Sequence, residues 1–314
     1  MHFREYSLYQ GRAGARRLMT AFLLIGVTAG GAVAAENGAS VYPAGVETVV
    51  PGLMPPSGKT LLAEFDNFYQ ANGLMDGKGH SLVPGFHLRV TAVAGKIVHN
   101  WGVKALGGVL VSSLGVPVLY EHLTGPFGSV HKTGLGNPDL SVLDVAYTKG
   151  NWHWWYGVDV FTPGAQYNKN DILNVGQHNF ATAPEGAFTY LPRHGKSEIS
   201  SKFQYIVNFT NPSNQYRSGH EFVWEYAAMQ NVTRNLAVGA NGYFSQQMTD
   251  DRQNGLMVGG GNRGRVLAPG PEIKYRLGRA ELIVKYQKEV LVENRTRGNS
   301  FWCQVGVPLW SHEK

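Results

Sequence analysis

This sequence has one cysteine, few charged residues and a single long apolar run. Cys303 alone cannot form an internal disulfide or a multi-cysteine metal or iron–sulfur site. Charged residues make up 16% of the 314 residues, whereas about 25% is usual in a soluble domain. The formal net charge is +6, but four arginines and one glutamate in the first 17 residues contribute +3 of it. No basic run follows, which argues against nucleic acid as a partner.

Motifs for catalysis, cofactors and metals are also missing or incomplete. The Gly-x-Ser-x-Gly motif of a hydrolase does not occur. Residues 259–264 fit the glycine pattern of a dinucleotide site, but this pattern should open a helix and here it opens a predicted strand. His122 and His131 share one loop without an acidic or cysteine partner. We therefore predict no cofactor, no metal and no catalytic residue.

Residues 1–34 are predicted to form a secretory signal peptide. A basic segment precedes the apolar stretch 18–34, and Ala32-Val33-Ala34 supplies the small residues of a cleavage site. A membrane anchor needs about 20 strongly apolar residues, whereas this stretch has 17 residues that include three glycines and two threonines. No later apolar run is long enough for a membrane helix. We therefore expect an exported chain.

The rest of the chain is rich in glycine and aromatic residues and shows the period of two that is typical of strands. The full sequence contains 40 Gly, 15 Tyr, 14 Phe and 7 Trp. The clearest alternation of apolar and polar residues runs over 198–209. In all, twelve strands are predicted, over residues 61–71, 86–94, 103–119, 138–148, 151–162, 179–192, 198–209, 219–230, 235–247, 266–277, 280–293 and 300–310.

The lengths of the connections between these strands predict an all-β fold, a transmembrane antiparallel up-and-down β-barrel. Short turns, such as 100–102, 149–150 and 278–279, alternate with long polar loops, such as 120–137 and 248–265. Outer-membrane barrels sort their connections in this way. Residues 35–59 contain four prolines and four glycines and are expected to form an irregular arm, a candidate plug for the lumen. The barrel itself is assigned to residues 60–314.

In a membrane barrel the apolar face of each strand is expected to contact lipid. Trp101, Trp152 and Trp154 lie beside the predicted short turns, where an aromatic girdle is expected. The opposite faces carry charges such as Glu64 and Asp66, which suit a lumen that contains water or a plug. A packed soluble barrel is the alternative explanation of the aromatic residues. The predicted lumen-lining, substrate-binding residues are Phe68, His87, Arg89, Trp155, Asp159, Lys202, Gln204, Glu225 and Tyr243.

Several short segments resemble a known family of outer-membrane transporters. They are Val41-Tyr42-Pro43-Ala44-Gly45-Val46-Glu47, Pro55-Pro56-Ser57-Gly58, Gly134-Leu135-Gly136-Asn137-Pro138, Thr162-Pro163-Gly164, Tyr216-Arg217-Ser218-Gly219, Gln247-Met248-Thr249-Asp250-Asp251 and Pro269-Gly270-Pro271-Glu272. Together they resemble the family named for the MetA pathway of phenol degradation, which includes SphA-like proteins. In fold this family is distantly similar to the long-chain fatty acid channels. Those channels have fourteen strands, whereas twelve are predicted here.

The resemblance implies a protein of the Gram-negative outer membrane that admits compounds for degradation. We therefore expect a channel for passive uptake of small hydrophobic, in particular aromatic, compounds. Its partners would be these solutes, outer-membrane lipid and the outer-membrane assembly machinery. Two alternatives are a barrel enzyme that hydrolyses lipid and a closed structural barrel. A Ser–His hydrogen bond on the outward face would favour the hydrolase.

Overall fold

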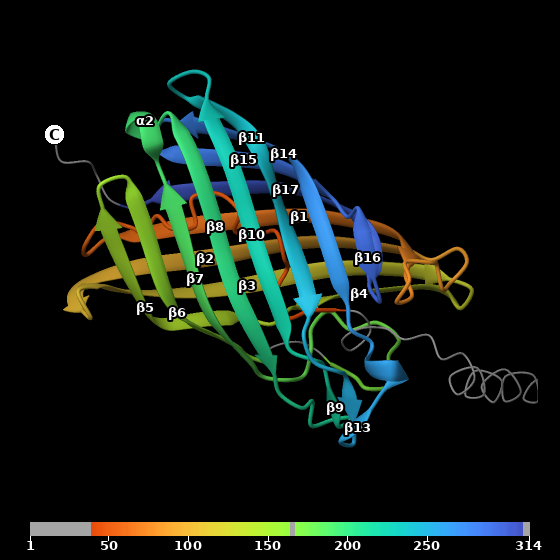
Figure 1. The fold of residues 1–314 in the computed structure, drawn as a ribbon. Helices are drawn as coiled ribbons and strands as arrows, with labels where there is room; N and C mark the ends of the chain where they lie inside the picture. Colours follow the sequence, from red (N-terminus) through yellow and green to blue (C-terminus); the bar gives the residue numbers. More distant parts are fainter. Residues whose placement is uncertain (1–38, 164–166, 310–314) are drawn as a thin grey trace, which may run out of the picture. The chain divides into compact units, whose positions relative to one another are not determined.

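The computed structural model describes residues 39–163 and 167–309 and shows a closed antiparallel barrel of twelve strands (Figure 1). The predicted signal peptide, residues 1–34, lies outside the described residues. Each barrel strand pairs with its neighbours in sequence, and pairing of the first strand with the last closes the barrel. The barrel strands are β1 (Thr60–Leu74), β2 (His87–Ala105), β3 (Gly108–Gly125), β5 (Asp139–Lys149), β6 (Trp152–Phe161), β7 (Ala181–Tyr190), β8 (Ser197–Asn208), β10 (Glu221–Asn231), β11 (Leu236–Gln247), β14 (Arg265–Leu277), β15 (Ala280–Lys288) and β17 (Thr296–Pro308).

The predicted alternation of short turns and long loops is present, with one turn in a different place. The turn predicted at 100–102 is wrong, because β2 continues through Trp101 to Ala105 and the chain reverses at Leu106-Gly107. Both turn residues have positive φ, as a two-residue hairpin turn requires. The pairing of β2 with β3 shifts register between Asn100 and Lys104. At this irregularity the alternation of inward and outward side chains is interrupted, and in the sequence such an interruption looks like a turn.

The long connections contain short elements that were predicted as loops. β4 (Gly128–Leu135) extends the barrel wall by pairing with the end of β3. β16 (Leu291–Glu293), by contrast, falls within the single strand predicted over 280–293 and pairs with β14. β9 (Tyr216–Arg217), β12 (Arg252–Gln253) and β13 (Leu256–Met257) form a small separate sheet, followed by the 3₁₀ turn η2 (Gly259–Gly261). At the short-turn end there is one helical turn, α2 (Pro192–Gly195). Among the described residues, no helix is long and apolar enough to cross a membrane.

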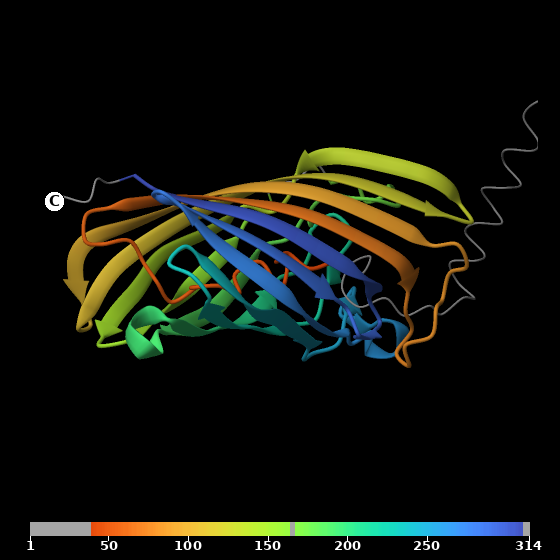
Figure 2. The ribbon, with the colours of Figure 1, turned by 90° about the horizontal axis from the view of Figure 1, so that it is seen from above.

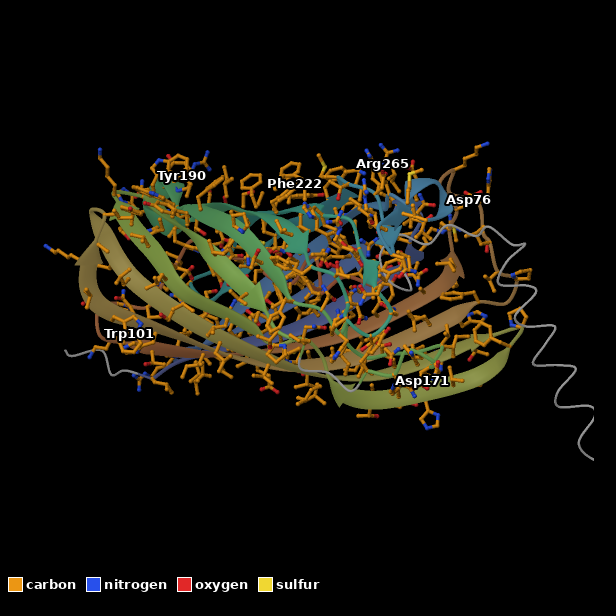
Figure 3. All side chains as sticks on the ribbon, turned by 90° about the horizontal axis from the view of Figure 1, so that it is seen from below. Asp76, Trp101, Asp171, Tyr190, Phe222 and Arg265 are labelled. Carbon is orange, nitrogen blue, oxygen red and sulfur yellow. The ribbon has the colours of Figure 1, made fainter. Side chains whose placement is uncertain are left out.

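Aromatic side chains gather on the outer surface at the short-turn end. Trp152 stacks on Tyr190 with 4.4 Å between ring centroids, and Tyr147 stacks on Trp154 at 5.3 Å. Trp101 and Tyr190 lie at this end of the molecule, whereas Asp76 and Asp171 lie at the long-loop end (Figure 3). The stacked rings form the girdle that a barrel presents at the membrane boundary.

The apolar side chains of a strand were expected to face lipid. Strands such as β8 follow this expectation, whereas on β1 and β2 the apolar face lines the lumen. On β8, Lys202 is buried inside and Phe203 is exposed. On β1, by contrast, Glu64 and Phe68 point outward, while Phe65 and Tyr69 point into the lumen. The prediction that Glu64 and Asp66 face the lumen is therefore wrong. Alternation shows that two faces differ but not which face is outside, and here the lumen wall is the apolar one.

The irregular arm, residues 39–59, lies inside the barrel. Figure 2 shows this segment, in orange-red, between the two walls of strands. Gln177 Nε2, from a long loop, donates to the carbonyl of Ala39 at 2.7 Å. At the short-turn end, Asn100 Nδ2 donates to the carbonyl of Pro55 at 2.7 Å. The arm thus runs along the lumen from one end of the barrel to the other.

Candidate functional site

The lumen is the candidate functional site, and polar groups of the strands hold the arm in it. Glu225 on β10 accepts hydrogen bonds from Tyr42 Oη at 3.0 Å, from the Glu47 amide at 3.1 Å and from the Gly45 amide. Lys285 on β15 donates to the carbonyl of Val46 at 2.7 Å. Prolines and glycines leave much of the arm without regular backbone partners, so strand side chains supply them.

Glu47 is the charged centre of these contacts. Its carboxylate lies 2.7 Å from Lys96 Nζ on β2 and also forms an ion pair with Lys202 on β8. Each lysine has a second carboxylate on the wall, Asp139 at 3.6 Å from Lys96 and Glu185 at 2.9 Å from Lys202. Burial alone would raise the pKa of Glu47, but the two lysines lower it well below its usual range. Glu47 is therefore an anion that bridges two distant strands.

Three cavities surround the arm. The outer cavity, of about 440 Å³, is lined by Phe127 and Ile172 of the long loops. The middle cavity, of about 210 Å³, lies next to it and shares Tyr42 and Trp302 with it. The inner cavity, of about 610 Å³, reaches Gly278 at the short-turn end.

The arm lies where the middle cavity meets the inner one. Val46, Glu47 and Lys96 line both of these cavities, so the bridged carboxylate sits at their boundary. The inward side chains of β2 and β3 make the wall apolar beside the outer and middle cavities, with Leu88, Val90 and Leu123 among them. The lumen therefore offers an apolar surface that the arm divides.

Comparison with known proteins fits this architecture. Residues 71–305 match the family described as "Putative MetA-pathway of phenol degradation". The chain belongs to this family. Its fold is similar to that of the COG4313 outer membrane channel from Pseudomonas putida F1, with 14% identity, a TM-score of 0.71 and coverage of 86% of this chain and 100% of that one. This phenol-degradation family barrel is thus a protein of the Gram-negative outer membrane with the fold of a channel.

A weaker likeness links the family barrel to the beta domain of the Bordetella autotransporter BrkA. The two chains are 11% identical over 80% of this chain and 99% of that one, with a TM-score of 0.48. No curated protein matches the chain in sequence.

Six of the nine predicted site residues lie in the lumen of this family barrel. Trp155 Nε1 donates to the carbonyl of Pro51 at 2.6 Å, and Lys202 and Glu225 bind the arm as described. Tyr243 Oη donates to Glu289 at 2.8 Å. Asp159 accepts from Ser141. Gln204 is buried, and neither of its amide atoms has a hydrogen-bond partner among the described residues. Contact of these residues with a solute remains a prediction.

The other three predicted site residues face outward, so their assignment to the lumen is wrong. Phe68 is 51% exposed and packs near Phe301 on the outer surface, with 6.5 Å between ring centroids. His87 and Arg89 are exposed on the outer face of β2. The cause is the same reversal that affects Glu64, because the apolar faces of β1 and β2 line the cavities.

Sequence reasoning missed three residues that matter in the lumen: Glu47, Asn67 and Lys96. Lys96 carried a usable signal, since it is the only charge in the apolar run 92–98. A lone charge in such a run indicates a buried partner. Neither Glu47 nor Asn67 carried such a signal. Glu47 lies in an irregular arm, which shows no periodicity. Asn67 lies on β1, whose inward and outward faces were assigned in reverse. Among the described residues, no three acidic, His or Cys side chains are placed to hold a metal.

Proposed function

We propose that this outer-membrane barrel is a channel for passive entry of small hydrophobic, mainly aromatic, compounds that the cell degrades. The observation that carries the proposal is the divided lumen with its apolar β2–β3 wall: cavities lie on both sides of an arm that is held by hydrogen bonds, by ion pairs and by apolar packing of Val41, Tyr42 and Val46. Membership of a family described by phenol degradation supports the substrate class. Insertion of such a closed barrel would depend on the outer-membrane assembly machinery.

Transport of this kind requires no catalytic residue. A solute would enter the outer cavity, contact the apolar inner face of β2 and β3, and pass to the inner cavity when the arm leaves the boundary at Glu47. Apolar walls bind such solutes weakly, which allows them to leave again. Because Asp139 and Glu185 stay beside the lysines, movement of Glu47 would not leave Lys96 or Lys202 without an opposite charge.

The test is uptake of radiolabelled aromatic and alkyl solutes by cells with and without the gene, at concentrations low enough to make entry limiting. We expect faster uptake of small aromatics in cells that produce the protein, and a further increase when residues 36–59 are deleted. Equal uptake in all strains across the panel would reject the channel and favour a closed structural barrel.

One observation bears on the hydrolase alternative. On the β3–β4 hairpin, His122 Nε2 lies 2.7 Å from Ser129 Oγ. A catalytic pair also needs a third group that orients the histidine. Among the described residues, no hydrogen bond joins His122 to a carboxylate. We expect Ser129→Ala to leave membrane lipid composition unchanged, and loss of a lipid-hydrolysis product in this variant would revive the enzyme.

A further inference from the structure

Asn67 is a polar side chain in an apolar part of the lumen. It lies on β1 and lines both the outer and the middle cavity. Its direct partners in the neighbouring strands are Ala92 on β2 and Trp302 on β17. The residue is only 7% exposed, and its amide Nδ2 has no hydrogen-bond partner among the described residues. An unsatisfied buried donor destabilises the fold, so such a group calls for an explanation.

The surroundings of this amide suit one flat ring. Trp302 donates its own N–H to Gln287 Oε1 at 3.0 Å, and Lys285 Nζ lies over its ring at 5.4 Å from the centroid; the side chain also lines the outer and middle cavities, where a solute ring can contact it. Val90 and Ala92 continue the wall as an apolar floor. The middle cavity, of about 210 Å³, exceeds the roughly 150 Å³ that hold benzene in an apolar protein cavity. A ring that packs here can bring one substituent to Asn67.

Charges around the outer cavity disfavour an anion. Glu121, Glu221 and Glu289 line it, and Arg295 is the one cation among the described residues of its lining. Arg295 Nη2 is already paired with Glu221 at 2.6 Å. A carboxylated solute would thus meet acidic side chains and a cation that is already paired, whereas a hydroxyl or carbonyl oxygen would meet a donor at Asn67.

A second polar group lies across the floor. Glu121 on β3 is separated from Asn67 by two strand spacings and two residues, which places the two Cα atoms about 12 Å apart along the wall. Both side chains point into the lumen and both line the two cavities. A phenolic hydroxyl can accept from an amide and donate to a carboxylate.

We propose that Asn67 is the hydrogen-bond donor of a binding site for uncharged, oxygen-bearing aromatic solutes, with the ring packed against Trp302 and the inner face of β2. This inference rests on the proposed function and narrows its substrate class. Phenols and aryl ketones belong to that class; hydrocarbons lack the acceptor, and aromatic carboxylates carry the wrong charge.

The first experiment measures binding to the purified full-length protein in detergent by calorimetry. The probes are toluene, acetophenone, phenol and benzoate. We expect Asn67→Leu to weaken binding of phenol and acetophenone roughly three- to tenfold, the loss of one hydrogen bond, and to leave toluene unchanged. Gln70→Leu, on the outer face of the same strand, is the matched control and should alter none of them.

A second variant separates the donor from simple polarity. Asn67→Asp keeps the shape but replaces the donor by an acceptor, so it should lose acetophenone, which can only accept, and retain more of the phenol affinity. Equal binding of phenol by the wild type and Asn67→Leu overturns the proposal, as does tighter binding of benzoate than of phenol. Heat-modifiable migration on gels verifies that each variant is a folded barrel.

Uptake by cells distinguishes this inference from the function on which it rests. Uptake of phenol that depends on the protein but not on Asn67 overturns the site and leaves the channel intact. Binding that depends on Asn67 without any gain in uptake rejects the channel and retains the site.

Discussion

At the scale of single residues, Glu47 matters because two lysines from distant strands share its carboxylate. A hydrogen bond to a charged group contributes about 1.5–3 kcal/mol, against about 0.5–1.5 kcal/mol for an ordinary one, and the Glu47 carboxylate accepts two of them. Lys96, Lys202 and Glu47 are all largely buried. The docked arm therefore depends more on this one side chain than on any one of its backbone contacts.

We expect Glu47→Gln to weaken docking of the arm by roughly 2 kcal/mol, because both lysines keep a wall carboxylate as partner, and this raises the undocked fraction about thirtyfold. The measurement is conductance of single channels in planar bilayers, with larger or more frequent openings in the variant. Asp66→Asn is the control, because Asp66 is a carboxylate on the outward face of β1 and lines none of the three cavities. Identical conductance of Glu47→Gln and the wild type would show that the ion pairs do not hold the arm.

The same residue predicts how the channel responds to pH. The two lysines lower the pKa of Glu47 below the value of about 4.3 in an unfolded chain. A lowered pKa stabilises docking at every pH above about 4.3, and this stabilisation is lost only as the pH falls through the lowered value. Conductance should thus stay constant from pH 8 to pH 5. An opening transition with a midpoint between pH 5 and pH 7 would contradict this assignment.

At the scale of elements, the turn of the arm at residues 43–46 fits closely against the wall. Gly45 has φ +94, and a Cβ at this position would collide with Gln287 and Tyr243. Gly58, further along the arm, has φ +70 but open space around it. The two glycines therefore share the strained backbone conformation and differ in what surrounds them.

Gly45→Ala should undock the arm, and Gly58→Ala should not. Both substitutions place a side chain at positive φ, at a cost of about 1–2 kcal/mol, but only the first also displaces wall side chains. Limited proteolysis of the arm is the readout, with faster cleavage expected in Gly45→Ala. If both variants are cleaved at the same rate, backbone strain rather than the close fit controls the arm.

Sequence reasoning predicted the strands well and their orientation only in part. All twelve barrel strands were predicted because a period of two over about ten residues is a strong local signal, as on β8. The hairpin β3–β4 was missed because its residues, among them Gly128 and Gly134, resemble a loop. The faces of β1 and β2 were reversed because orientation depends on what fills the lumen, which alternation along one strand cannot show.

At the scale of the whole molecule, the barrel and the arm depend on different interactions. Continuous antiparallel ladders join the twelve strands, and β1–β17 closes them without any arm residue. Deleting residues 36–59 should leave a folded, heat-modifiable barrel, because Lys96 and Lys202 retain the wall carboxylates Asp139 and Glu185. Migration on gels with and without heating is the measurement. A barrel that no longer folds would show that the arm is part of its core.

The path of the arm also constrains the order of events during folding. The arm is continuous with β1 at the short-turn end, yet it contacts residues as remote in sequence as Glu225 and Lys285, 178 and 239 positions from their partners. Contacts over such separations form late, because the intervening chain must be ordered first. The arm must therefore lie within the curling sheet before β1 meets β17, or be threaded through a finished barrel afterwards. Closure around the arm avoids that threading step. The arm would then already lie in the lumen when β1 pairs with β17, although its hydrogen bonds to the distant strands form later.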